Sequence, residues 1–93
     1  GVIFGMTAAL HSDVTIRAGR VVQSNFHDYR VVRIDEAPQI DVLLVESAEK
    51  PGGIGEPGTV SVQPAIANAV HAATGQRIVA LPIDRNLLAR NRA

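Results

Sequence analysis

The stretch that decides the fold is residues 40–58, which read IDVLLVESAEKPGGIGEPG. Residues 40–46 predict a strand with the continuous apolar run Val42-Leu43-Leu44-Val45 at its centre, and a run without alternation is typical of a strand buried on both faces. Residues 47–58 are rich in Gly and Pro and predict a loop. A helix is expected next, because Pro64 suits a first helical turn, apolar residues beyond it share one face, and Gly75 can end it.

The flanking segments complete a mixed pattern of helices and strands. Apolar spacing predicts a helix over residues 1–11, and residues 14–16 and 21–22 flank a turn with Gly19 that indicates a β-hairpin. Residues 24–30 are expected to form a loop and residues 31–34 a short extended piece. Residues 78–81 predict a last strand, and Asp84 can cap a short helix through residue 88. The sequence therefore predicts one α+β unit over residues 1–93: helix, hairpin, strand, Gly-rich loop, helix, strand and short helix, without an internal boundary.

Composition narrows the classes of function. The chain has 93 residues with nine basic and nine acidic side chains, so its formal net charge is zero. This balance argues against a nucleic-acid partner, which a basic excess would hold. Cys is absent, which excludes disulfides, thiolate metal sites and a Cys nucleophile. The apolar fraction is 46%, and the chain opens in mid-pattern without Met. We expect a piece of something larger whose apolar faces are covered by missing parts or by self-association.

The chemically informative stretch is the glycine-rich loop, which carries one acid, Glu56. Glycines let a backbone come close to a ligand and point bare N–H groups at it. A carboxylate on such a loop, stiffened by Pro57 ahead of a helix, is well placed to sit in a cleft, where burial would raise its pKa toward the range of a general base. The alternative is a solvated turn with an ordinary surface glutamate.

The other candidate motifs give weaker evidence for a function. Gly53, Gly55 and Gly58 match G-x-G-x-x-G, but they do not follow a strand at once, and no acid lies about twenty positions beyond. The three histidines have no metal-ligand spacing, so no metal site is predicted and hydrogen bonding is their expected role. Residues 24–30 contain triad residue types without a nucleophile elbow. Hydrogen bonds and a charge pair are expected to fix that loop, and Asp35 and Glu36 are expected to be solvated.

The order of several segments resembles a known family. Residues 53–57 (GIGEP), 64–70 (PAIANAV), 73–78 (ATGQRI) and 81–83 (LPI) resemble the C-terminal end of the molybdopterin-binding large subunit of the xanthine oxidase/aldehyde oxidase family. Upstream, residues 5–10 and 25–30 (NFHDYR) resemble the segments that precede that loop. Many relatives have Lys before the loop and Pro-Pro after it. The form seen here, with Pro51 before and Pro57-Gly58 after, is most similar to the bacterial isoquinoline 1-oxidoreductase-like and aldehyde dehydrogenase branch.

The resemblance implies a reaction and a cofactor. It implies hydroxylation of an aldehyde or an N-heterocycle with water as the oxygen source, by molybdenum carried on molybdopterin, in the cytosine dinucleotide form. Glu56 would act as general base toward the Mo-bound hydroxyl, and the backbone of Gly53, Ile54 and Gly55 would lie beside the cofactor. No protein side chain need bind the metal. The 93-residue chain alone is expected to hold no cofactor and to be inactive.

The resemblance also implies partners, and it leaves a rival. The partners would be the rest of the large subunit, a small iron–sulfur subunit with two 2Fe-2S clusters, and a small-molecule substrate. The rival is a non-catalytic interaction or assembly module that keeps the fold; a small nucleotide-binding domain is the weakest reading. The sequence leaves the compartment open between cytoplasm and periplasm.

Overall fold

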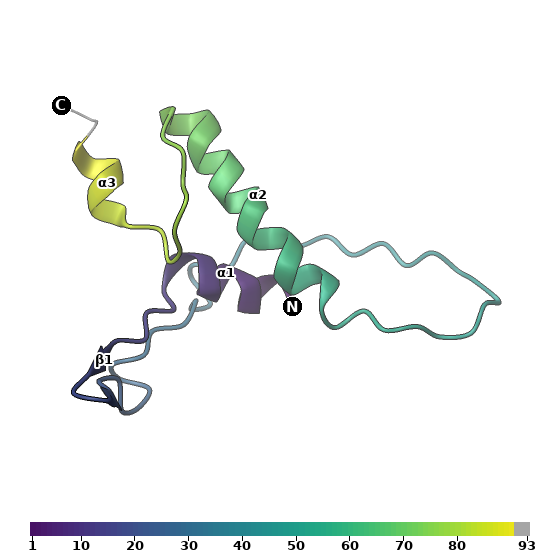
Figure 1. The fold of residues 1–93 in the computed structure, drawn as a ribbon. Helices are drawn as coiled ribbons and strands as arrows, with labels where there is room; N and C mark the ends of the chain where they lie inside the picture. Colours follow the sequence, from purple (N-terminus) through teal and green to yellow (C-terminus); the bar gives the residue numbers. More distant parts are fainter. Residues whose placement is uncertain (91–93) are drawn as a thin grey trace.

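The computed structural model describes residues 1–90 and contains three helices and one hairpin within that range. The helices are α1 (Val2–Leu10), α2 (Pro57–Thr74) and α3 (Arg85–Arg90). The hairpin consists of β1 (Ile16–Arg17) and β2 (Arg20–Val21). Figure 1 shows α1 crossing the foot of α2, the hairpin on one side of α1, and the long segment before α2 looping away on the other.

Helix α1 is the element around which the rest is arranged. Its Gly5 is buried against the first turns of α2, and its Ala9 is fully buried. Thr7, 7% exposed, accepts a hydrogen bond at Oγ1 from the Val32 N–H at 3.1 Å. The Ala9 carbonyl accepts the Ile83 N–H at 2.8 Å. Three segments far apart in sequence therefore meet on one short helix.

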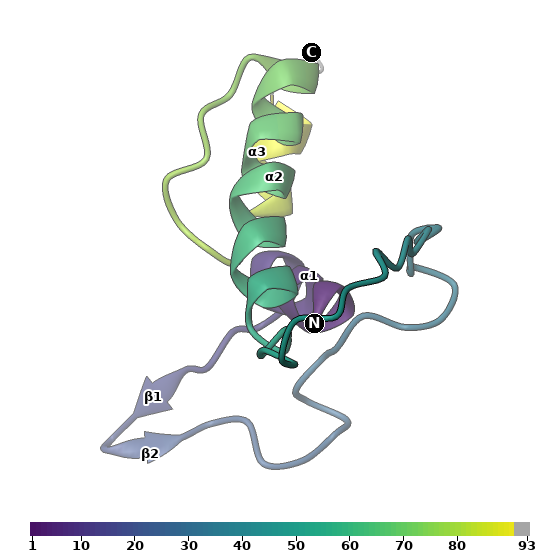
Figure 2. The same cartoon turned by 90° about the vertical axis from the view of Figure 1, so that its right-hand side faces the viewer.

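The hairpin confirms the predicted turn. Ile16 pairs with Val21 and Arg17 with Arg20, antiparallel. The two turn residues both have left-handed backbone, with φ of 49° at Ala18 and 74° at Gly19. Two positive φ values in a two-residue turn match the twist of antiparallel strands, and Gly adopts that region without steric cost. Both strands are exposed, and Figure 2 shows the hairpin standing clear of the helices.

The predicted strands over residues 40–46 and 78–81 do not form within residues 1–90, so a strand at either place stays a prediction. Neither segment pairs with another, and residues 31–34 form no strand either. Leu43 is 92% exposed and Val79 is 88% exposed. An apolar run reports that a segment is suited to burial, but a strand also needs neighbouring strands for its N–H and C=O groups. Within residues 1–90, no second set of strands is present to supply them.

The predicted second helix starts seven residues too late. Helix α2 begins at Pro57, so Pro64 lies inside it rather than in its first turn. Pro57 takes the first helical position, where a missing N–H costs nothing. The predicted end is confirmed: Gly75 has φ of 73°, and its N–H donates to the His71 carbonyl at 2.8 Å.

The C-terminal helix also begins where the sequence indicated. Asp84 Oδ1 accepts the Asn86 N–H at 2.8 Å, which is the predicted side-chain cap, and α3 extends through Arg90. None of the helices over residues 1–90 has the length and apolar character to cross a membrane. The grouping of these elements into a larger α+β domain stays a prediction, as does the single unit over residues 1–93.

Candidate functional site

Glu56 occupies the residue immediately before α2. Its backbone is helical, with φ of −86° and ψ of −40°, and its carbonyl accepts the N–H groups of Thr59 at 2.9 Å and Val60 at 3.2 Å. Its side chain makes no capping bond and is exposed. The expected burial in a cleft is therefore not found here. The main chain of Glu56 is fixed by the helix, while its carboxylate stays free to meet a group that approaches from outside.

The glycines before Glu56 are not required by their backbone conformation. None of Gly52, Gly53, Gly55 and Gly58 has a positive φ, so L residues could adopt the same turn. A Cβ at Gly58 would lie 3.3 Å from the Val2 nitrogen, so Gly58 is explained by the packing of α1 on α2.

The other three glycines have open space around them. A Cβ at Gly52, Gly53 or Gly55 would meet no described atom within 4 Å, and the Ile54 side chain is 84% exposed. Packing within residues 1–90 thus gives no reason for glycine at these positions. A large group can approach this backbone from the open side, and the loop fits a cofactor in that sense.

Residues 24–30 form the expected hydrogen-bonded loop. The Asp28 carboxylate accepts the Ser24 N–H at 2.9 Å, the Asn25 N–H at 2.9 Å and the Ser24 hydroxyl at 3.0 Å. These bonds, with the one from Asn25 largest, lower the pKa of Asp28 to about 2. The Tyr29 hydroxyl donates to Ser12 Oγ at 3.0 Å and ties the loop to the end of α1. These contacts explain the loop as structure and require no triad.

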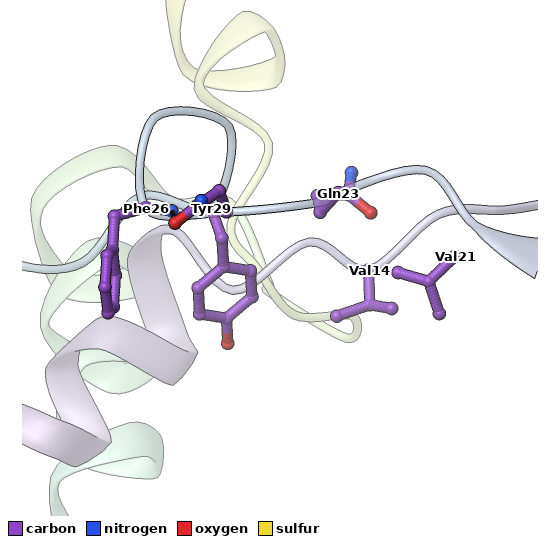
Figure 3. Close-up of a pocket in the computed structure, with 6 residues that line it drawn as sticks. Val14, Val21, Gln23, Phe26 and Tyr29 are labelled. Carbon is purple, nitrogen blue, oxygen red and sulfur yellow. Dashed lines mark hydrogen bonds between the residues drawn. The ribbon is translucent and has the colours of Figure 1, made fainter.

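Two apolar hollows lie beside this loop. The first, of about 300 Å³, is open to solvent and is shown in Figure 3 with Val14, Val21, Gln23, Phe26 and Tyr29 labelled around it. The second, of about 620 Å³, lies between α1 and residues 29–32. Glu56 and the open glycines line neither hollow. The hollows and the glycine loop are therefore separate features of this chain.

The sequence did not predict a cluster of three side chains, His11, Arg30 and Glu36, in which His11 is buried. The His11 side chain is only 4% exposed, and its Nε2 lies 3.5 Å from Glu36 Oε1, too far for a good hydrogen bond. Glu36 in turn pairs with Arg30, so the expected solvation of Glu36 is wrong, while Asp35 is exposed as expected. Burial and the nearby Arg30 charge lower the pKa of His11. Arg30 and Glu36 are six residues apart, but His11 lies far from both in the sequence, so no local motif indicates the cluster.

No group of His, Asp and Glu suited to a metal ion occurs among the described residues. Comparison with known proteins gives no matching family model. The chain is 41% identical over 83 residues to the isoquinoline 1-oxidoreductase subunit beta of Brevundimonas diminuta, a match covering 89% of this chain and 11% of that protein.

Two further relatives extend this similarity. The chain is 38% identical over 81 residues to a membrane-bound aldehyde dehydrogenase (pyrroloquinoline-quinone) of Gluconacetobacter polyoxogenes, covering 87% of this chain and 10% of that protein. It is 34% identical over 92 residues to the aldehyde oxidoreductase molybdenum-binding subunit PaoC of Escherichia coli (strain K12), covering 90% of this chain and 13% of that protein. The chain thus spans about a tenth of the length of the curated relatives it matches.

Proposed function

Because this chain belongs to the family of molybdenum-binding subunits of the xanthine and aldehyde oxidoreductases, we propose that it works within a molybdenum hydroxylase that oxidises an aldehyde or an N-heterocycle. The resemblance read from the sequence is thereby confirmed at the level of the family. When bound, molybdenum on molybdopterin would supply the two-electron oxidation of the substrate. The substrates of the relatives differ by name, so the substrate class is set by the whole protein.

The observation that carries this proposal is the pairing of open glycines with a free carboxylate. Gly53, Ile54 and Gly55 lie exposed directly before Glu56, with open space at the Cβ positions of both glycines, and Gly1 lies near the Gly55 carbonyl. We propose that this backbone lies beside the pterin cofactor, in the cytosine dinucleotide form, where its N–H groups can hydrogen-bond to it. A side chain at Gly53 or Gly55 would occupy the space that the cofactor needs.

Glu56 is proposed as the general base. Its main chain is held by the first turn of α2, and that turn is held by α1, so the carboxylate starts from a fixed point. It would accept a proton from the oxygen nucleophile that derives from water and attacks the substrate carbon. General bases contribute about 10²–10⁴-fold to a rate. Desolvation of Glu56 by the cofactor and the rest of the protein would bring its pKa nearer to neutrality.

The two electrons removed from the substrate must leave the enzyme. We propose that they leave through a small iron–sulfur subunit with two 2Fe-2S clusters. Support comes from the Brevundimonas relative, which is named as a beta subunit and so belongs to a multi-subunit enzyme in that organism. A non-catalytic assembly module remains the rival. The name of the Gluconacetobacter relative includes pyrroloquinoline quinone, so this quinone is the alternative cofactor to be tested.

The test uses the full-length protein purified with its neighbouring small subunit, from a host shown to mature a related molybdenum enzyme. We expect close to one molybdenum per chain and no pyrroloquinoline quinone in the denatured extract. Glu56→Gln should retain the molybdenum and lower turnover by at least about a hundredfold. The matched control is Glu49→Gln, which changes an exposed carboxylate in the same loop and should leave the rate unchanged.

Each alternative has its own outcome in that experiment. A Glu56→Gln enzyme with a near-normal rate would remove Glu56 from the mechanism. Absence of molybdenum with quinone present would assign the other cofactor. Absence of both, with no oxidation of aldehydes or N-heterocycles, would favour the assembly module.

A further inference from the structure

The segment of residues 40–46 exposes more apolar surface than any solvated loop needs. Leu43 is 92% exposed, and Leu44 and Val45 are each 90% exposed. Exposed apolar residues are normal when they occur singly, whereas a contiguous run marks a contact surface. Figure 1 shows the chain leaving the helices and returning at α2, and within residues 1–90 the side chains of residues 42–45 stay 74–92% exposed.

The pattern of the run specifies what kind of contact it makes. In an extended chain, alternate side chains point to opposite faces. Ile40, Val42 and Leu44 would share one face, which ends at Glu46, while Leu43 and Val45 would share the other, which begins at Asp41. Over residues 42–45 both faces are therefore apolar, with one acid at each end of the segment, and a two-sided apolar centre is typical of strands inside a sheet that is covered on both sides. A run of this length also matches an ordinary strand.

The main chain of the segment points to the same conclusion. Across residues 1–90, no main-chain group of residues 40–46 forms a hydrogen bond. Burying these side chains would bury their N–H and C=O groups too, and unpaired buried groups are costly. A flat apolar surface cannot satisfy them. Partner strands on both edges can.

We infer that residues 40–46 are an interior strand of a β-sheet whose other strands come from the rest of the large subunit. This inference rests on the proposed function only for the existence of that larger polypeptide. The match covers only 11%, 10% and 13% of three relatives, so most of the sequence of each relative lies outside the matched part. A second copy of the chain fits less well, because pairing the segment with itself occupies one edge and leaves the other unpaired.

The strand has a consequence for Glu56. The loop of residues 47–55 runs from this segment to the residue that begins α2. Its far end is held by α2, whose first turn packs on α1 through Gly58 and Thr59. Its near end has no anchor among the described residues. Pairing of residues 40–46 supplies that anchor, so the sheet acts as the positioning element for Gly53, Gly55 and Glu56.

The test is hydrogen exchange by mass spectrometry on the full-length protein with its partner subunit. In peptides that cover residues 40–46, we expect amide exchange at least about a hundredfold slower than the rate for an unstructured chain, since ladder amides exchange only on opening. Free exchange in a protein that holds molybdenum and turns over would overturn the inference and leave the proposed function standing. Slow exchange in a protein that holds no molybdenum and has no activity would support the inference and contradict the proposed function. Protection that disappears when the protein is diluted to single copies would assign the segment to self-association and overturn the inference.

Variants on the two faces sharpen the result. Leu43→Asp and Leu44→Asp each place a charge on one face, and both should lower the yield of folded protein or speed exchange in residues 40–55 by at least about tenfold. The matched control, Ala48→Asp, adds the same charge to the exposed loop and should leave exchange in residues 40–46 unchanged. Tolerance of Asp at one of the two leucines would mean that this face is solvated, which contradicts an interior strand. If neither variant folds, the exchange measurement on the unmodified protein still decides.

Discussion

Gly5 of α1 lies directly against the carbonyl of Thr59 in the first turn of α2. A Cβ built on Gly5 would overlap the Thr59 carbonyl oxygen and the Val62 side chain, closer than real Cβ atoms approach any neighbour. The Thr59 N–H donates to the Glu56 carbonyl at 2.9 Å, so the same turn fixes the backbone of Glu56. The turn of α2 that contacts Gly5 therefore also holds the backbone of the proposed base.

This contact predicts that Gly5→Ala separates α1 from α2. The obstructing atoms include backbone, which cannot rotate away, and overpacking of this kind costs about 1–3 kcal/mol. In the full-length protein, exchange over residues 57–63 should be faster and turnover should be lower with molybdenum retained. Gly52→Ala is the control, because its Cβ would meet open space and should change stability by less than about 0.5 kcal/mol. Equal tolerance of both substitutions would show that the helices do not approach this closely.

A second prediction concerns Thr7, the buried hydroxyl of α1. It donates to the Ile3 carbonyl at 3.1 Å and accepts the Val32 N–H at 3.1 Å. Thr7→Val keeps the shape but leaves the Val32 N–H unpaired, at a cost of about 1–3 kcal/mol. The expected result is faster exchange of the Val32 amide. Thr7→Ser keeps the hydroxyl and should preserve its protection; exchange that is equally fast in both variants would point to lost packing instead.

The local elements of this fold were readable from the sequence because their causes are local. Helix α1, the turn at Gly19, the stop at Gly75 and the cap at Asp84 depend on residues within a few positions of each other. The strands over residues 40–46 and 78–81 were not, because pairing depends on segments that lie elsewhere. The apolar run at residues 42–45 indicated a buried segment, but no part of residues 1–90 buries it.

For the candidate site, too, some features could be predicted from the sequence and others could not. Glu56 and the glycines were identified from composition and resemblance, and the structure adds that three of the glycines have no packing role of their own. Which side of the loop faces a cofactor depends on chain outside these residues. The cluster of His11, Arg30 and Glu36 was missed because it forms only when the end of α1 meets the turn after residue 30.

That cluster predicts a pH dependence of stability. The pKa of His11 is lowered from 6.5, first by burial and then by Arg30, while Glu36 raises it and Arg85 lowers it slightly further. Because the folded pKa is the lower one, the unfolded chain binds a proton first as the pH falls below 6.5. Stability from His11 is therefore present above that pH and is lost as the pH falls through the lowered value. Thermal midpoints of wild type and His11→Gln, compared from pH 7.5 downward, should differ in slope. The exposed His71→Gln is the control, and equal slopes for wild type and His11→Gln would contradict the burial of His11.

The last prediction decides where α2 begins. Pro64 lies inside the helix and cannot donate to the carbonyl one turn earlier, which costs about 3 kcal/mol in a helix interior. Pro64→Ala should therefore stabilise α2 by up to about 3 kcal/mol and slow exchange over residues 65–74. Pro57→Ala, at the first helical position, removes no helical hydrogen bond and should have a small effect. If Pro64→Ala instead proves neutral or destabilising in the full-length protein, the helix there begins near Pro64, as the sequence pattern indicated, and residues 57–63 belong to the glycine loop. Loop residues would then both precede and follow Glu56, and the position of Glu56 would depend on the cofactor rather than on α1.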